Sequence, residues 1–153
     1  MPTAQLGDRA AILIDGPDAE HFLQNILTVD LDQLGGGEAR PGALLSPQGK
    51  ILFDFLVSRH GQSGFLIDCR ADSATDFMRR LMLYRLRAKA DISVPDQIVV
   101  SARWHDDSAV SDDDSTPSQA ESGWLAGWFA DRRFPEGAGV FRSYGEAAGS
   151  DSP

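Results

Sequence analysis

Cysteine is nearly absent from this sequence, since Cys69 is the only one among 153 residues. One thiol cannot form a disulfide within the chain, and it cannot supply the several thiolates of a metal or cluster cage. The three histidines, His21, His60 and His105, are far apart and have no partner at metal-ligand spacing. The sequence therefore predicts neither a disulfide nor a metal site built by this chain alone.

Long apolar runs are also missing. No stretch approaches the roughly 18 to 20 apolar residues that a membrane-spanning helix needs. The first ten residues, MPTAQLGDRA, lack the basic start and the apolar segment of a signal peptide. We therefore expect a cytoplasmic protein with no membrane partner.

Positive charge is scarce. The chain carries 14 Lys and Arg against 23 Asp and Glu, a formal net charge of −9, and residues 105–122 contain six acidic residues and no basic one. Without a broad basic surface, we expect no direct binding to nucleic acid. The sequence also lacks a G-x-S-x-G motif and a phosphate-cradling glycine loop, which argues against the hydrolases and nucleotide-binding proteins that use them.

The segments that are present predict an α+β fold. The composition, 42% hydrophobic and 24% charged, is that of an ordinary globular domain. Alternation and turn residues predict strands at residues 10–14, 39–45, 51–57, 65–69, 89–94, 98–104, 123–130 and 140–144. Helical spacing places Phe22, Leu23, Ile26 and Leu27 on one face, and then Phe77, Leu81 and Tyr84 on another. This order predicts a mixed or antiparallel sheet with two main helices.

Two local patterns predict where the helices begin. Pro17 suits a first helical position because its missing N–H has no intrahelical partner there, and Asp18 and Glu20 add negative charge at the positive end of the dipole. Ser73-x-x-Asp76 resembles a capping box and predicts the start of the second helix.

The same pass along the chain divides it into parts. We expect residues 1–104 to form a first α+β subdomain and residues 105–122 to form an acidic flexible loop. Residues 123–145 would start a second, truncated subdomain. Residues 146–153 would be a disordered tail.

Four segments carry a resemblance to a known family: Leu13–Ala19, Phe22–Asp30, Ala43–Asp54 and Tyr84–Ile92. Their order and spacing resemble the N-terminal part of YgfZ-type proteins. Those proteins are relatives of the glycine-cleavage aminomethyltransferase, GcvT, and support iron–sulfur cluster maintenance. A weaker similarity continues through Asp131–Tyr144, so the resemblance covers about residues 6 to 145.

The resemblance implies a GcvT-like folate-binding domain with tetrahydrofolate as its cofactor. It also implies iron–sulfur proteins or assembly factors as partners, with an indirect effect on tRNA modification. The family's Lys-Gly-Cys segment does not occur in this sequence. Because the family's folate channel is built by several parts, we expect tetrahydrofolate to bind this short chain weakly or not at all. We also expect self-association through apolar surface left open.

Asp54 is the first candidate for folate contact. A carboxylate between Leu52 and Leu56 on one face of a strand is costly unless it is paired or faces a cleft. The alternative is an edge-strand Asp that faces water. In the aminomethyltransferases, the matching strand carries two adjacent acids, whereas this chain has Phe53-Asp54. The missing acid favours a non-catalytic binding protein over an aminomethyl (one-carbon) transferase.

Five further residues are candidates for the same ligand. Thr28 and Asp30 could hold the pterin's polar groups, or they could perform only helix-end and turn chemistry. Lys50 could meet the glutamate tail, or it could simply belong to a hairpin. Arg85 and Arg87 could bind the carboxylates of a polyglutamate or of an acidic partner, or they could balance a helix dipole.

Three functions follow as hypotheses. The first is a tetrahydrofolate-binding accessory protein in iron–sulfur cluster assembly or repair. The second is a tetrahydrofolate-dependent enzyme resembling the aminomethyltransferase. The third is a truncated interaction module without a ligand.

Overall fold

The computed structural model describes residues 3–95, 98–104, 128–134 and 139–146. Its strands are β1 (Thr3–Gln5), β2 (Arg9–Asp15), β3 (Glu38–Leu45), β4 (Ile51–His60), β5 (Gly64–Arg70), β6 (Asp91–Ser93), β7 (Ile98–Arg103), β8 (Trp128–Asp131) and β9 (Phe141–Glu146). Its helices are α1 (Ala19–Ile26) and α2 (Ala74–Arg85), with short 3-10 turns at Leu31–Gln33 and Ala71–Ser73.

The strands form one sheet in the order β1-β7-β9-β8-β3-β4-β5-β2-β6. Every neighbouring pair is antiparallel except β3 and β8, which run parallel. The predicted mixed α+β class is therefore confirmed. The sequence pattern missed β1, because its three residues contain no apolar run and become a strand only by pairing with β7.

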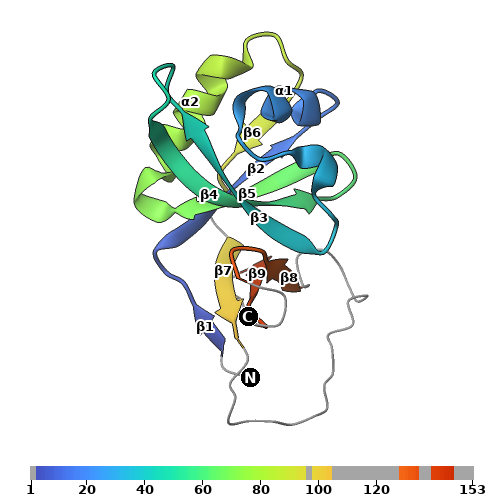
Figure 1. Cartoon of the computed structure of the whole chain (residues 1–153), viewed down its shortest axis with the longest axis vertical. Helices are drawn as coiled ribbons and strands as arrows, with labels where there is room; N and C mark the ends of the chain where they lie inside the picture. Colours follow the sequence, from blue (N-terminus) through green and yellow to red (C-terminus); the bar gives the residue numbers. More distant parts are fainter. Residues whose placement is uncertain (1–2, 96–97, 105–127, 135–138, 147–153) are drawn as a thin grey trace, which may run out of the picture.

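Figure 1 shows two groups of strands. Strands β2 to β6 form the larger group, with α1 and α2 packed on one face, and β1, β7, β8 and β9 form the smaller group. The two groups are joined where Glu38 and Ala39 of β3 pair with Ala130 and Asp131 of β8. Residues 98–104, which the sequence assigned to the first part, thus lie in the smaller group through β7.

Apolar side chains fill both faces of the larger group. Phe55 and Val57 of β4 belong to the main cluster under the helices, whereas Leu56 belongs to a second cluster with residues of the smaller group. The main cluster also takes the buried residues of both helices, Ala19, Phe22, Leu23, Ala74, Phe77 and Leu81. Neighbouring side chains of β4 therefore point to opposite faces, as the alternation along residues 51–57 indicates, and residues 55–58 are buried.

Both helix starts differ in detail from the prediction. Pro17 lies before α1, whose cap residue is Asp18, and the Asp18 carboxylate accepts a hydrogen bond from the Lys89 backbone N–H at 2.8 Å. Gly16, at φ +135°, allows this approach, because a Cβ there would lie 2.5 Å from the Lys89 carbonyl oxygen.

The capping box at Ser73 does not form. Ser73 occupies the cap position, but its side chain bonds to no helix N–H, because the 3-10 turn at Ala71–Ser73 leads straight into α2. Its hydroxyl instead donates to the Asp72 carboxylate at 3.3 Å.

Several predictions lie outside the described residues: the acidic loop at 105–122, the first part of the strand predicted at 123–130, and residues 147–153 of the predicted tail. β9 extends to Glu146, the first residue of that tail. Within the described ranges, neither helix is long and apolar enough to cross a membrane.

Candidate functional site

A pocket of about 160 Å³ opens where β4 and β5 meet the start of α2. Its walls are Leu52, Phe53, Asp54, Cys69, Arg70 and Ser73. The register of the two strands explains this set. Leu56 pairs with Asp68 in the antiparallel register, so Asp54, two residues before Leu56, comes beside Arg70, two residues after Asp68.

Asp54 and Arg70 give the pocket both signs of charge. Asp54 is exposed to solvent, as in the water-facing alternative, and it also lines the pocket, so its contact with a ligand stays a prediction. Arg70 donates to the Asp72 carboxylate at 3.0 Å, and this hydrogen bond raises the pKa of Arg70, which stays protonated. The pair offers an acceptor and a donor to a small polar ring.

Phe53 forms an apolar wall of the pocket and also anchors it. Its ring stacks on Phe77 of α2 with centroids 4.6 Å apart and planes nearly parallel. The position where the family resemblance led us to expect an acid is thus occupied here by a side chain that packs against the main cluster. A carboxylate in that position would lose its solvation among apolar side chains.

Cys69 lines the pocket but offers no nucleophile. Its side chain is buried, and burial, followed by the charge of Asp68, raises the pKa of the thiol to about 12. At neutral pH the thiol is protonated. Because only a thiolate acts as a nucleophile or a metal ligand, the pocket has no reactive sulfur.

Thr28 and Asp30 do not line the pocket. Thr28 pairs with Ala43 of β3, and its hydroxyl accepts the Ala43 N–H at 3.0 Å. The Asp30 carboxylate accepts from the Asp32 N–H at 3.1 Å and from Gln24 at 3.0 Å. Both side chains therefore perform the turn and helix-end chemistry that was the alternative to ligand contact.

The three predicted cations also lie away from the pocket walls. Lys50 is exposed in the hairpin between β3 and β4, where its backbone bonds to Ser46. Arg85 donates to the Ala90 carbonyl at 2.9 Å, and Arg87 is exposed just beyond the end of α2. Of the six predicted residues, the structure brings only Asp54 to the pocket.

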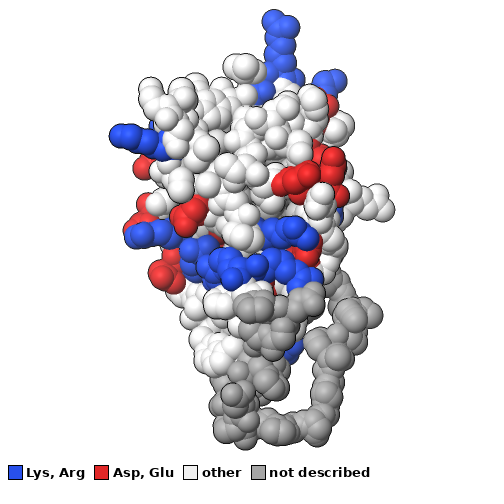
Figure 2. All heavy atoms as spheres, in the orientation of Figure 1, with Lys and Arg blue, Asp and Glu red and all other residues white. Residues whose placement is uncertain are grey.

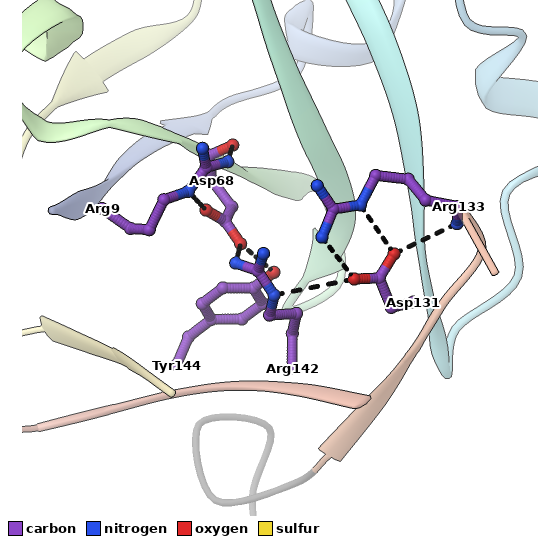
Figure 3. A network of polar contacts seen from close by, with 6 residues as sticks. All are labelled: Arg9, Asp68, Asp131, Arg133, Arg142 and Tyr144. Carbon is purple, nitrogen blue, oxygen red and sulfur yellow. Dashed lines mark hydrogen bonds and ion pairs between the residues drawn. The ribbon is translucent and has the colours of Figure 1, made fainter. Parts of the chain in front are cut away.

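A buried carboxylate, Asp68 of β5, was missed by the sequence analysis. It accepts from Arg9 Nε at 2.8 Å, from Arg142 at 2.7 Å and from the Tyr144 hydroxyl at 2.8 Å (Figure 3). Burial and the neighbouring Asp68 carboxylate raise the pKa of Tyr144 well above its usual value. Tyr144 is therefore a fixed donor, and Asp68 joins β5 to β2 and β9.

The network continues to a second buried carboxylate. Asp131 accepts from Arg133 Nε at 3.0 Å and from its terminal nitrogen at 2.7 Å. Arg142 lies between the two acids, because its Nε is also 3.6 Å from Asp131 (Figure 3). Two carboxylates and their arginines thus occupy the region where the two groups of strands meet.

Glu38 adds a third carboxylate to this junction. It accepts from Gly35 N–H, Arg40 and Arg132, each at 2.7 Å. Burial alone would raise the pKa of Glu38, but these hydrogen bonds outweigh it and lower the pKa to about 2. A band of basic side chains crosses the molecule at this level in Figure 2.

The rule that singled out Asp54 could also have found Asp68. Asp68 stands in the apolar run Phe65–Cys69, where an unpaired carboxylate would be equally costly. Its partners on β9 could not be named from the sequence, because they lie 74 and 76 residues away. No group of His, Cys, Asp and Glu within the described ranges could hold a metal ion.

The mixed sheet with its layer of helices is an α+β fold, and the sequence comparison assigns it to a family. Residues 7–100 match the family model described as the GCVT N-terminal domain. This match covers more than half of the chain, so the chain belongs to that family.

Individual proteins are similar in sequence to part of this chain. The mitochondrial iron–sulfur cluster assembly factor IBA57 homologue of Neurospora crassa is 26% identical over 110 residues, covering 67% of this chain and 25% of that protein. The IBA57 homologue of Pyricularia oryzae is 32% identical over 110 residues, covering 68% and 28%. The chain thus spans about a quarter of the length of these relatives.

A solved structure supports the fold. The glycine cleavage system aminomethyltransferase T from Bartonella henselae superposes with a TM-score of 0.60 at 24% identity, over 65% of this chain and 27% of that one. At this identity the likeness shows the fold alone.

Proposed function

We propose that this chain acts in iron–sulfur cluster assembly or repair as a YgfZ-type accessory protein that binds tetrahydrofolate without catalysing one-carbon transfer. Support for the cluster role comes from the names of the IBA57 relatives. Partners would be iron–sulfur proteins or assembly factors, and any effect on tRNA modification would be indirect. The cytoplasmic location stays a prediction.

The pocket beside Asp54 is the observation that carries the folate part of the proposal. The Asp54 carboxylate would accept N–H groups of a pterin, Arg70 would donate, the Ser73 hydroxyl oxygen would accept, and Leu52 and Phe53 would cover the ring's apolar surface. Bound tetrahydrofolate would supply the amine nitrogens that accept one-carbon units in folate chemistry, but this chain would not transfer such a unit. Pockets for drug-sized ligands hold about 300 to 1,000 Å³, so one of about 160 Å³ fits only a single part of the cofactor.

Phe53 favours binding over transfer. An aminomethyltransferase-like enzyme is the second candidate, since a solved relative of that name has the same fold. Here the position of the first acid is filled by a ring stacked on Phe77, which leaves Asp54 as the single carboxylate of the pocket. One carboxylate can bind the tetrahydrofolate, but the second acid of the transferase pattern is missing.

Anaerobic calorimetry with tetrahydrofolate tests the ligand. We expect weak binding to the full chain, with a Kd above about 10 µM, and at least a tenfold loss in Asp54→Ala. Asp91→Asn changes an exposed carboxylate on β6, outside the pocket, and is the matched control. Equal affinity in the wild type and Asp54→Ala would remove Asp54 from the site, and no binding at millimolar ligand would refute the folate proposal.

The cluster role is tested separately in cells. Loss of the gene should lower the activity of iron–sulfur enzymes in extracts, and the wild-type gene should restore it. Unchanged activity of those enzymes would refute this part of the proposal, whatever the calorimetry shows.

A further inference from the structure

Helix α2 has apolar side chains on two opposite faces. Its inner face packs into the main cluster through Ala74, Phe77 and Leu81. Its outer side carries the exposed Met82 and Leu83 beside Arg79, at i, i+3 and i+4 spacing, and Leu86 follows directly after the last helical residue, Arg85. Leu83 is 64% exposed and Leu86 is 84% exposed. A helix that meets only water on its outer side is normally polar there.

The other helix shows that this fold does not require an apolar outer face. The exposed residues of α1 are His21, Gln24 and Asn25, all of them polar. Both helices cover the same face of the same sheet (Figure 1). The apolar outer side of α2 is therefore a property of its own sequence.

Leu86 adds a second observation. It ends α2 at φ 52° and ψ −110°, a backbone conformation that is strained for a bulky side chain and ordinary for glycine. The side chain held in this conformation makes little contact with the core, since most of it is exposed. Folding alone would favour glycine here, so the leucine points to another use.

Positive charge surrounds these apolar residues. Residues 79–89 contain five basic residues and no acidic one, in a chain whose net charge is −9. Arg87 and Lys89 are exposed, and Arg79 is only loosely paired, 3.7 Å from Asp76. Basic side chains project from the end of the molecule in Figure 2 where Figure 1 places the segment after α2.

We propose that the α2 docking face, formed by Arg79, Met82, Leu83, Leu86 and Arg87, binds a partner protein through an acidic segment that has apolar residues at helical spacing. The apolar residues would bury against the partner, and the guanidinium groups would meet its carboxylates. This surface is independent of the folate proposal, because the end of α2 lies about 20 Å from Ser73 at the helix rise per residue.

Two other occupants fit the face less well. A second copy across a two-fold axis would place the basic groups of one face against those of the other. A lipid surface needs anionic headgroups, which repel a chain of net charge −9, and three apolar side chains bury little area in a bilayer. The charge pattern of the face therefore favours an acidic protein segment.

The test uses the full chain and two labelled peptides of about 18 residues, both with leucine at helical spacing. One carries glutamate around the leucines and the other carries lysine. Anisotropy should show at least a tenfold preference for the acidic peptide, weakening as salt rises. Leu83→Asp should lose at least tenfold in affinity, whereas Gln62→Asp in the β4–β5 turn should bind like the wild type.

Leu86→Gly separates docking from folding. The circular dichroism spectrum of this variant should match that of the folded wild type. Its affinity for the acidic peptide should nevertheless be lower than that of the wild type. Equal binding of the two peptides, or wild-type affinity in a folded Leu83→Asp, would overturn the proposal. If the wild type forms a dimer and Leu83→Asp is a monomer, the face belongs to a second copy and the proposal is overturned. If the wild type floats with phosphatidylserine vesicles, the face binds lipid and the proposal is likewise overturned.

Discussion

The Tyr144 hydroxyl donates a 2.8 Å hydrogen bond to the carboxylate of Asp68, a residue 76 positions earlier in the chain. Both residues are buried, and the same carboxylate oxygen accepts from Arg142. Asp68 is thereby held by the last described strand of the smaller group and by Arg9 of the larger one. Asp68 is therefore one of the links between the two groups of strands, beside the pairing of β3 with β8 and the second apolar cluster.

Replacing Asp68 with Asn should cost about 3 to 5 kcal/mol of unfolding free energy, because the buried Arg142 would lose the charge that compensates it. Urea denaturation followed by circular dichroism measures the change. Asp72→Asn is the control, since Asp72 pairs with Arg70 at the surface and its loss should have no measurable effect. A loss below about 1 kcal/mol in Asp68→Asn would show that the network contributes little.

Stability should fall as the solution becomes acidic, in a window set by Glu38. The pKa of Glu38 is about 2 in the folded chain against an ordinary 4.5, so the folded state favours the ionised form. Its contribution is complete above pH 4.5 and is lost as the pH falls toward 2, and it amounts to about 3 kcal/mol.

Glu38→Gln isolates that contribution. The variant should be less stable at neutral pH, and its stability should depend less on pH between about 5 and 2 than that of the wild type. Denaturation curves at several pH values provide the comparison. Parallel pH profiles for the two proteins would show that other carboxylates cause the acid sensitivity.

Cys69 should resist alkylation while the chain is folded. Its thiol is buried and its pKa is raised to about 12, first by burial and then by the charge of Asp68, so almost no thiolate exists at pH 8. Iodoacetamide followed by mass spectrometry should show labelling at least about 100-fold slower than in guanidinium chloride. Comparable rates in the two conditions would mean that this part of the sheet opens readily.

Leu86→Gly should make the chain more stable than the wild type, by up to about 1 kcal/mol. Glycine removes the strain of the positive φ and gives up little burial, while its extra freedom in the unfolded chain offsets part of the gain. Thermal unfolding measures the change. Leu86→Ala keeps the strained backbone and should show no gain, so equal stability of the two variants would contradict the strain.

Local patterns were enough to predict most of the elements and part of the site. The spacing of Phe77 and Leu81 identified the inner face of α2, and the alternation along β4 placed Phe55 and Leu56 on opposite sides. The cost of a carboxylate in an apolar strand led to Asp54. Each of these inferences needs only residues that are close in the sequence.

Relationships between distant segments could not be predicted in this way. The register between β4 and β5 places Arg70 beside Asp54 at the pocket. The pairing of β7, β8 and β9 brings Arg142 within hydrogen-bond distance of Asp68. Residues 3–5 form strand β1 because they pair with β7, which is distant in the sequence. Thr28 and Asp30 illustrate the opposite difficulty, since their local bonds satisfy the side chains without any ligand.

The short parallel pairing of β3 with β8 links the two groups of strands through Glu38 and Ala39, and beside the second apolar cluster the junction contains ion pairs between arginines and carboxylates. Hydrogen bonds between charged groups have preferred distances and angles. They therefore fix the relative orientation of the two groups of strands more strictly than apolar contacts do. Because Asp68 of β5 bonds to both Arg142 and Tyr144, a change at this carboxylate would remove two of the bonds that set the position of β9 against β5.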